Sequence, residues 1–270
     1  MKLEFSNLDE NQTRFVLSDS NQAFANSLRR AMTSEVKTFA LEDVRIYDNS
    51  SALFDEILAH RLGLIPLVTE YSGYVTRDAC SCEGAGCSSC SVTFTMSIEG
   101  PCLVTSKDLI SEDPVIKSVY DDIPIVKLEK DQKVVIEARA ILNSGNEHVK
   151  WQPTTICGYK NYPVIRSDDN CDGCGHCVEG CPKGILHVLD GRVTVKEGMY
   201  EECSLCRLCE QACLNSGIGE KPAIHIEMDP TRFLFTMEST GSLPSETIIK
   251  EGLLFLKSQS DNLLETLEDL

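Results

Sequence analysis

Positive charge is scarce in this sequence, which has 25 Lys and Arg residues against 42 Asp and Glu and a formal net charge of −17 at pH 7. Broad binding of nucleic acid relies on many contacts between Lys or Arg side chains and phosphates. We therefore expect little or no direct nucleic-acid binding, although membership of a larger nucleic-acid machine with basic surfaces elsewhere is compatible with the charge. An acidic surface that keeps the protein in solution and one that meets basic partners explain the composition equally well.

Long apolar runs are missing as well. No stretch approaches the roughly 18 apolar residues that mark a membrane-spanning helix, and Met1–Phe5 lacks the basic segment and apolar run of a signal peptide. We expect a soluble, cytoplasmic protein with no membrane partner. Its 270 residues, 42% of them hydrophobic, allow one large domain or two to three modest ones.

Catalytic constellations are also missing. The five His residues fall on unrelated predicted elements, and neither a phosphate-binding Gly-rich loop with Lys nor a Gly-x-Ser-x-Gly elbow occurs. Asp121 and Asp122 form an acidic pair, which a solvated turn explains better than a magnesium site. We expect no catalytic residue in this chain, so its membership of an enzyme depends on its partners.

Cysteine, by contrast, is abundant and patterned. Eight of the 14 cysteines form two copies of the spacing Cys-x2-Cys-x2-Cys-x3-Cys, over Cys171–Cys181 and Cys203–Cys213. This is the bacterial ferredoxin run, in which thiolates hold 4Fe–4S clusters and the fourth cysteine of each run serves the other cluster. We expect cluster one on Cys171, Cys174, Cys177 and Cys213, and cluster two on Cys203, Cys206, Cys209 and Cys181. Zinc on the same cysteines is the alternative.

A second cysteine group lies in a loop rich in Gly and Ser. Its members are Cys80, Cys82, Cys87 and Cys90. Four thiolates suit a tetrahedral structural zinc ion, and the Cys-x2-Cys half is a common half-site. A labile thiol or disulfide loop and a third iron–sulfur site are the alternatives. Cys102 and Cys157 are expected to be single packed cysteines.

Hydrophobic periodicity predicts both helices and strands. Alternation predicts strands near residues 3–5, 15–17, 41–47, 92–98, 134–140, 224–228 and 233–237, and helical spacing predicts helices over 21–36 and 55–62. Asp190 and Gly191 predict a tight hairpin between the two cysteine runs.

The tail from Pro244 onward is predicted to be helical, with an apolar heptad seam that only Ser260 interrupts. The seam residues singled out are Ile249, Leu253, Leu256, Leu263 and Leu267. So apolar a helix must pack on something. A core helix of this chain and an interface shared with another chain are the two interpretations.

Three segments resemble one known family. Phe24–Met32 resembles the signature of the alpha-like subunits of cellular RNA polymerases, and Asp55–Leu67 is similar to the archaeal and eukaryotic branch of that family. His148–Pro153 resembles the family's His-x-Lys-Trp-x-Pro element. A ferredoxin-like insert points within this family to the archaeal alpha-like subunits, in the form that carries two clusters. The loop over Cys80–Cys90 resembles the zinc loop of the eukaryotic counterpart, with a middle spacing one residue longer.

The resemblance implies an α+β fold with three parts. These are a discontinuous alpha-like dimerisation domain over 1–42 plus 224–270, a mostly β insert domain over 43–165 and a ferredoxin-like iron–sulfur domain over 166–223. The implied role is that of a non-catalytic scaffold that pairs with RNA polymerase subunit L, recruits small subunits N and P, and docks the two large catalytic subunits.

The resemblance also implies an interface on the first helix. Its expected residues are Phe24, Leu28, Arg29, Arg30 and Met32. Arg29 and Arg30 are expected to bind acidic or backbone groups of neighbouring subunits, with a solvated helix face as the alternative. The rival function is a ferredoxin-type electron-transfer protein or oxidoreductase subunit, which explains the two cysteine runs and leaves the other features unexplained.

Overall fold

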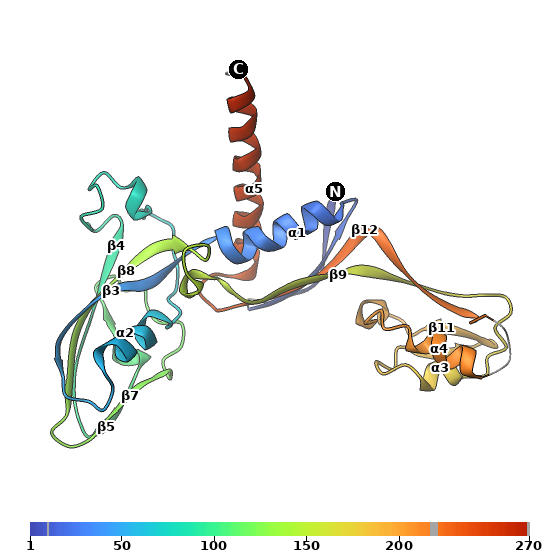
Figure 1. The fold of residues 1–270 in the computed structure, drawn as a ribbon, viewed down its shortest axis with the longest axis horizontal. Helices are drawn as coiled ribbons and strands as arrows, with labels where there is room; N and C mark the ends of the chain where they lie inside the picture. Colours follow the sequence, from blue (N-terminus) through green and yellow to red (C-terminus); the bar gives the residue numbers. More distant parts are fainter. Residues whose placement is uncertain (10, 217–220, 269–270) are drawn as a thin grey trace. The chain divides into compact units, whose positions relative to one another are not determined.

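The computed structural model describes residues 1–9, 11–216 and 221–268, and Figure 1 labels the elements. The chain forms two compact units. The first consists of Met1–Ser6, Arg14–Ala25 and Tyr159–Phe235, and the second of Asn7–Thr13, Asn26–Gly158 and Thr236–Leu270. Among the described helices, none has both the length and the apolar character that crossing a membrane requires.

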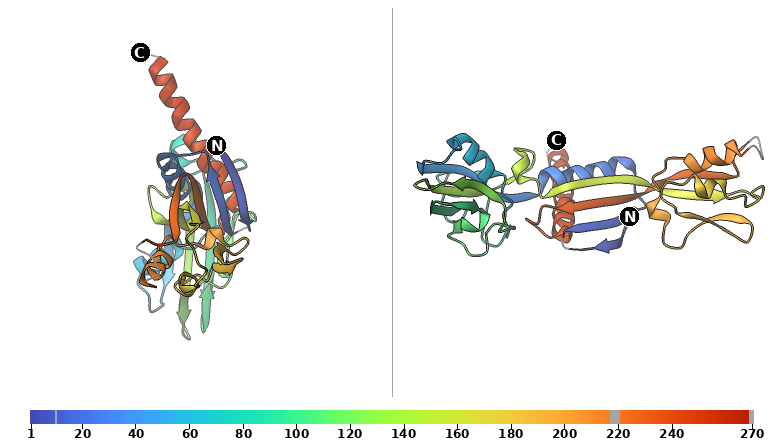
Figure 2. Two further views of the ribbon diagram at one scale, coloured as in Figure 1. Left: turned by 90° about the vertical axis from the view of Figure 1, so that its right-hand side faces the viewer. Right: turned by 90° about the horizontal axis from the view of Figure 1, so that it is seen from below.

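A four-stranded sheet with the order β1-β2-β12-β9 lies mostly in the first unit, and Figure 2 shows its strands side by side. The strands are β1 (Lys2–Leu8), β2 (Gln12–Ser18), β9 (Thr154–Ser167) and β12 (Ile224–Ser239). Aromatic rings form its core. Phe15 stacks on Phe235 with ring centroids 4.8 Å apart, and Tyr159 lies edge-on to Phe233 at 5.7 Å.

Both ferredoxin-type cysteine runs lie in this first unit, next to a short hairpin. The elements are α3 (His176–Glu179), β10 (Leu186–Leu189), β11 (Arg192–Val195), the 3-10 turn η5 (Tyr200–Glu202) and α4 (Leu208–Asn215). The hairpin loop has φ of 50° at Asp190 and 74° at Gly191. Positive φ at both positions is typical of a type I′ turn, which confirms the hairpin predicted from the Asp-Gly pair.

The second unit is built on an antiparallel sheet with the order β3-β8-β4-β6. Its strands are β3 (Lys37–Asn49), β4 (Ser91–Glu99), β6 (Ile110–Ser111) and β8 (Lys133–Ser144), while β5 (Cys102–Thr105) pairs with β7 (Pro124–Leu128). Alternate residues of β4, namely Val92, Phe94 and Met96, are buried, as the period of a strand predicts. The helix α2 (Asp55–Gly63) contacts β3 and buries Leu58 and Leu62.

Short 3-10 turns connect these strands, and one of them belongs to the His-x-Lys-Trp-x-Pro element. The turns are η2 (Arg77–Ala79), η3 (Ser106–Asp108) and η4 (Val149–Trp151). The buried Trp151 donates its indole N–H to the carbonyl of Ile141 on β8 at 3.2 Å, and its own carbonyl accepts from the Thr38 hydroxyl on β3 at 2.8 Å. The element therefore fastens the two long strands of the sheet together.

The first helix and the terminal helix meet at a turn. The helix α1 (Gln22–Arg30) continues into a π-helical turn η1 (Ala31–Glu35), against which α5 (Ser245–Glu268) packs. A Cβ at Gly252 would lie 3.0 Å from Cγ of Met32, so this glycine permits the close approach. Ile249 is buried, whereas Leu263 and Leu267 are 62% and 57% exposed.

The sequence predicts many of these elements and misses others. The expected early strands and the helix over 55–62 are confirmed, and the helix expected over 21–36 ends at Arg30 before the π-helical turn. The strands expected at 224–228 and 233–237 are one strand, β12, and β5, β6, β7 and β9 were not expected. The mixture of helices and strands confirms the α+β class, while the three-domain division and the ferredoxin-like fold stay predictions.

Candidate metal centres

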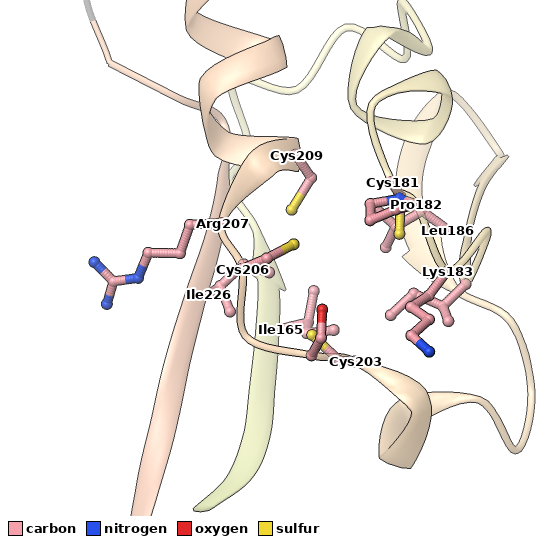
Figure 3. Close-up of a pocket in the computed structure, with 12 residues that line it drawn as sticks. Ile165, Cys181, Pro182, Lys183, Leu186, Cys203, Cys206, Arg207, Cys209 and Ile226 are labelled. Carbon is pink, nitrogen blue, oxygen red and sulfur yellow. The ribbon is translucent and has the colours of Figure 1, made fainter. Parts of the chain in front are cut away.

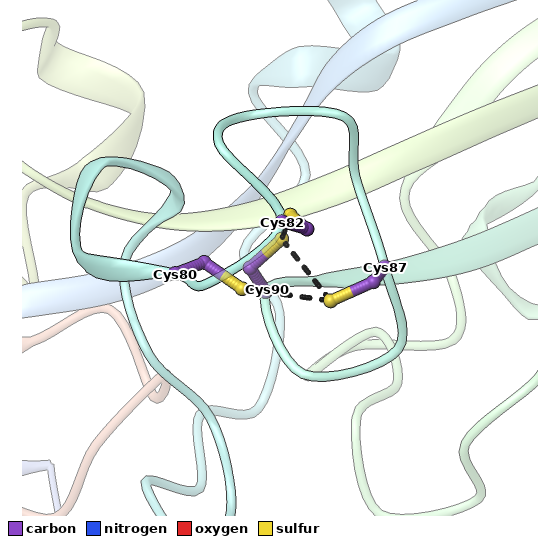
Figure 4. Close-up of side chains that lie close together, drawn as sticks. All are labelled: Cys80, Cys82, Cys87 and Cys90. Carbon is purple, nitrogen blue, oxygen red and sulfur yellow. Dashed lines mark hydrogen bonds between the residues drawn. The ribbon is translucent and has the colours of Figure 1, made fainter.

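Four cysteine sulfurs of the second unit form a cage. The Sγ atoms are 3.5 Å apart for Cys80 and Cys87, and 3.6 Å apart for Cys82 and Cys90. All four lie within 4.8 Å of one another, and Figure 4 shows them turned toward a common centre. Thiolates bound tetrahedrally at about 2.3 Å from one zinc ion lie about 3.8 Å apart. These sulfur distances are longer than a disulfide bond, which is about 2.05 Å.

The loop that carries the cage is anchored at both ends. Gly86 has a φ of 82° and a Cβ there would lie 3.2 Å from Nη1 of Arg139, so a larger residue would be strained. Cys90 is fully buried and leads directly into β4. Before the first cysteine, Arg77 donates from Nη2 to the carboxylate of Asp43 on β3 at 2.7 Å. The sheet therefore positions the loop through side chains outside the cysteine motif.

In the cage, Cys82 and Cys87 have a lowered pKa, whereas Cys80 and Cys90 have a raised pKa. A hydrogen bond from the Cys80 thiol is the largest of the effects that lower the pKa of Cys82 to about 6, and the thiolate is the form that binds metals. The hydrogen bond with Asp43 is the main reason why the pKa of Arg77 is raised, and the charge of Cys90 adds to it. Nε of Arg77 is buried and has no hydrogen-bond partner among the described residues. Since a divalent ion leaves four thiolates with net negative charge, the neighbouring guanidinium fits a loaded cage.

In the first unit, one cysteine of the first run joins three of the second. The side chains of Cys181, Cys203, Cys206 and Cys209 line one cavity together with Ile165, Ile185, Leu186 and Ile226. Figure 3 shows Cys181 across this cavity from Cys206 and Cys209. The structure therefore brings together the four cysteines that the ferredoxin spacing assigns to cluster two, in a cavity that Lys183 and Arg207 also line.

The remaining four cysteines also lie near one another. Burial is the main reason why the pKa of Cys177 rises to about 11, and the charges of Cys213, Cys171 and Cys174 raise it further. These neighbours are the residues expected to hold cluster one. The sulfur of Cys213 also accepts the backbone N–H of Ala223 at 3.3 Å, the kind of contact that ligating thiolates of iron–sulfur proteins receive.

The two ferredoxin-type groups differ from the cage in their spacing. Across the described ranges, only the cage brings three or more potential ligand atoms within 4.8 Å of one another. Each group of four thiols matches, in kind and number, the ligands that a 4Fe–4S cluster takes.

Comparisons with known proteins give the family. Residues 44–157 match the family model described as RNA polymerase Rpb3/RpoA insert domain. The chain is 45% identical to the DNA-directed RNA polymerase subunit Rpo3 of Methanosarcina mazei, over 100% of this chain and 99% of the relative. The chain belongs to the Rpo3 family. The subunit of the same name from Methanosarcina acetivorans is 44% identical, over 100% of this chain and 99% of the relative. That from Methanosphaera stadtmanae is 40% identical, over 98% of this chain and 97% of the relative. The resemblance to alpha-like polymerase subunits is confirmed.

In this member of the Rpo3 family, the predicted interface residues differ in burial. Leu28, Met32 and Ile249 are buried, Phe24, Arg29, Leu253 and Leu256 are half-buried, and Arg30, Leu263 and Leu267 are exposed. The side chains of Leu28, Met32 and Ile249 are covered within the chain, and α5 packs against the π-helical turn that contains Met32. The large apolar side chains of α5 that stay exposed are those of Leu254, Leu263, Leu264 and Leu267.

One residue near cluster two was missed in the sequence. Nζ of Lys160, on β9, donates to the carbonyl oxygens of Glu201 at 2.7 Å and Cys203 at 2.6 Å. Arg14 pairs with Glu202 in the same turn. No local sequence signal marks these residues, because their partners are about 40 or more positions away along the chain.

Proposed function

We propose that this chain is a non-catalytic assembly subunit of a DNA-directed RNA polymerase in the archaeal cytoplasm. The observation that carries the proposal is the identity of 45% to an Rpo3 subunit over the whole chain. That match includes both helices of the predicted interface and both cysteine-rich regions. A ferredoxin-type electron-transfer protein accounts only for Cys171–Cys213 and is not supported. The aspartates that bind the catalytic metal are expected in the largest subunit.

Subunit L is the proposed partner of α5. Leu254, Leu263, Leu264 and Leu267 are between 46% and 62% exposed. Four such side chains, of which three lie on the second half of α5, form an apolar surface that water does not solvate well. The half-buried Leu253 and Leu256 continue it toward the packed half of the helix. A helix of similar character on a second alpha-like chain would cover this surface, which supports a dimerisation domain over 1–42 and 224–270.

The insert domain over 43–165 and the ferredoxin-like domain over 166–223 are proposed to dock further subunits. Small subunits N and P and the two large subunits are the expected partners. Exposed apolar residues on and beside α2 support a docking role for the insert domain, since Phe54 is 79% exposed and Ile57 is 49% exposed. In the dimerisation domain, the exposed Arg30 provides a cation for acidic or backbone groups of neighbouring subunits.

The proposed cofactors are two 4Fe–4S clusters and one zinc ion. Cys171, Cys174, Cys177 and Cys213 would hold the first cluster, Cys181, Cys203, Cys206 and Cys209 the second, and Cys80, Cys82, Cys87 and Cys90 the zinc ion. Metals held this way stabilise only the folded arrangement of their ligands. The chain's own residues supply thiolates, exclude water and fix the loops, so that a docking surface forms only on the loaded domain.

Copurification tests the proposal. An affinity-tagged copy of the full chain, expressed in its natural cells and purified without oxygen, should bring down the polymerase subunits in stoichiometric amounts. A variant with Leu263→Glu and Leu267→Glu should bring down none of them if pairing precedes assembly. Recovery of a redox enzyme in place of polymerase subunits would overturn the proposal.

A further inference from the structure

The site proposed for cluster two lies among cations. Nζ of Lys160 donates hydrogen bonds to the backbone carbonyls of Glu201 and of the ligand residue Cys203. Lys183 and Arg207 line the same cavity (Figure 3). Arg207 lies 3.9 Å from Glu210, whereas neither Lys160 nor Lys183 forms an ion pair within the described part of the chain. The carboxylate of Glu202, which pairs with Arg14, and that of Glu210 offset part of the positive charge at this site.

Lys160 is the cation most firmly held at this site. Its side chain is half-buried, and its ammonium donates to the carbonyl oxygen of the ligand residue Cys203 at 2.6 Å. A charge that is fixed and partly shielded from water acts more strongly on its neighbours than a charge on an exposed side chain.

The site proposed for cluster one has the opposite surroundings. Asp168, Asp172, His225 and Lys221 line the cavity that Cys174 and Cys213 share. The carboxylate of Asp172 accepts the backbone N–H of Cys174 at 3.1 Å, and Asp168 is bonded to His225 at 2.9 Å. Lys221 is exposed. At this site, therefore, the charged group that is hydrogen-bonded to the backbone of Cys174 is a carboxylate, that of Asp172.

Charge of this kind acts directly on the reduction of an iron–sulfur cluster. One electron from an external low-potential donor, dithionite in the test below, makes the cluster and its thiolates more negative by one unit, with no bond formed or broken. A neighbouring cation stabilises the reduced form and a neighbouring carboxylate destabilises it. Net charge and hydrogen bonds around the sulfurs are among the factors that set these potentials.

We propose that Lys160 raises the reduction potential of cluster two, so that cluster two accepts an electron before cluster one. The proposal rests on the two clusters of the proposed function and assigns different redox roles to them. Lys160 holds the turn that leads into Cys203, and its charge acts on the cluster. The competing explanation is purely structural, in which Lys160 only fastens the turn before Cys203 to β9.

Anaerobic redox titration of the full chain, followed by electron paramagnetic resonance, separates the two explanations. In Lys160→Gln, which keeps an N–H donor but loses the charge, the ratio of reduced to oxidised cluster two at a fixed potential should fall about tenfold. For one electron this is a shift of about 59 mV. Lys160→Arg should keep the potential near that of the wild type, and Lys2→Gln, which removes an exposed charge at the start of β1, should change neither wave.

A variant at the site of cluster one shows which potential belongs to which cluster, without replacing any cysteine ligand. Asp172→Asn keeps the acceptor for the Cys174 N–H and should raise the lower of the two potentials, while Lys160→Gln lowers the higher one. Movement of different waves in opposite directions supports the proposal. Loss of iron and sulfide from Lys160→Gln with unchanged potential of the remaining clusters would overturn it. Absence of iron and sulfide from the wild type would overturn the cofactor assignment as well.

Discussion

Replacing Leu263 and Leu267 by Ala should weaken pairing with subunit L without destabilising the isolated chain. The two side chains are 62% and 57% exposed, and full burial of a Leu side chain is worth about 1.5–3 kcal/mol relative to exposure. Each therefore has about 1–2 kcal/mol to gain at an interface, most of which the Ala pair would lose. A combined loss of about 2–3 kcal/mol raises the dissociation constant about 30- to 150-fold.

Two controls distinguish an interface from a stability effect. Glu265→Ala lies on the same turn of α5 but removes an exposed charge, so its dissociation constant should change little. Ile249→Ala truncates a side chain that is buried in the chain itself, and should lower the free energy of unfolding by about 2–5 kcal/mol. The Leu pair should change that free energy by less than about 0.5 kcal/mol.

Analytical ultracentrifugation of the two purified subunits over a concentration series gives the dissociation constant, and denaturant unfolding of the isolated chain gives the stability. An Ala pair that binds subunit L as tightly as the wild type does would refute the assignment of this surface. The same conclusion would follow if Glu265→Ala weakened binding as much as the Ala pair.

Three further predictions concern the metal sites and the packing of α5. Cys82→Ser should lower the zinc content of the purified chain, measured by mass spectrometry, from one ion per chain to a small fraction. Cys102→Ser should keep the zinc content of the wild type, and equal zinc in both variants would exclude the cage as the zinc site. Cys181→Ser should lower iron and sulfide by about half, from near eight atoms of each, and loss of neither would show that it is not a ligand. Gly252→Leu should lower the free energy of unfolding by about 1–3 kcal/mol through overpacking, because even a Cβ there approaches a methionine to 3.0 Å. Gly158→Ala is its control in the same denaturant unfolding measurement, because a Cβ at Gly158 meets nothing within 4 Å.

Local signals were sufficient where a structure depends on near neighbours. The hairpin at Asp190 and Gly191 follows from two residues that tolerate positive φ. Alternation along β4 and β8 follows from one face of the sheet being buried. The strand β9 was missed because its residues are mostly half-buried on both faces and include Gly158 and Pro163, which are uncommon inside strands.

In the candidate sites too, features that depend on near neighbours were predicted and features that depend on distant contacts were missed. Spacing alone assigned Cys181 to the group of the second run, and the structure places it there. The burial of Met32 depends on the close approach of α5 at Gly252, which the periodicity of neither helix could indicate. Lys160 was missed for a similar reason, because its two carbonyl partners come from a turn that is distant along the chain.

Reconstitution of the polymerase from separately purified subunits tests whether this chain is an assembly subunit. Omission of the chain should prevent both assembly of the large subunits and RNA synthesis. Adding the loaded chain should restore both, and the chain alone should synthesise no RNA. Full assembly and transcription in its absence would contradict its role as an assembly subunit.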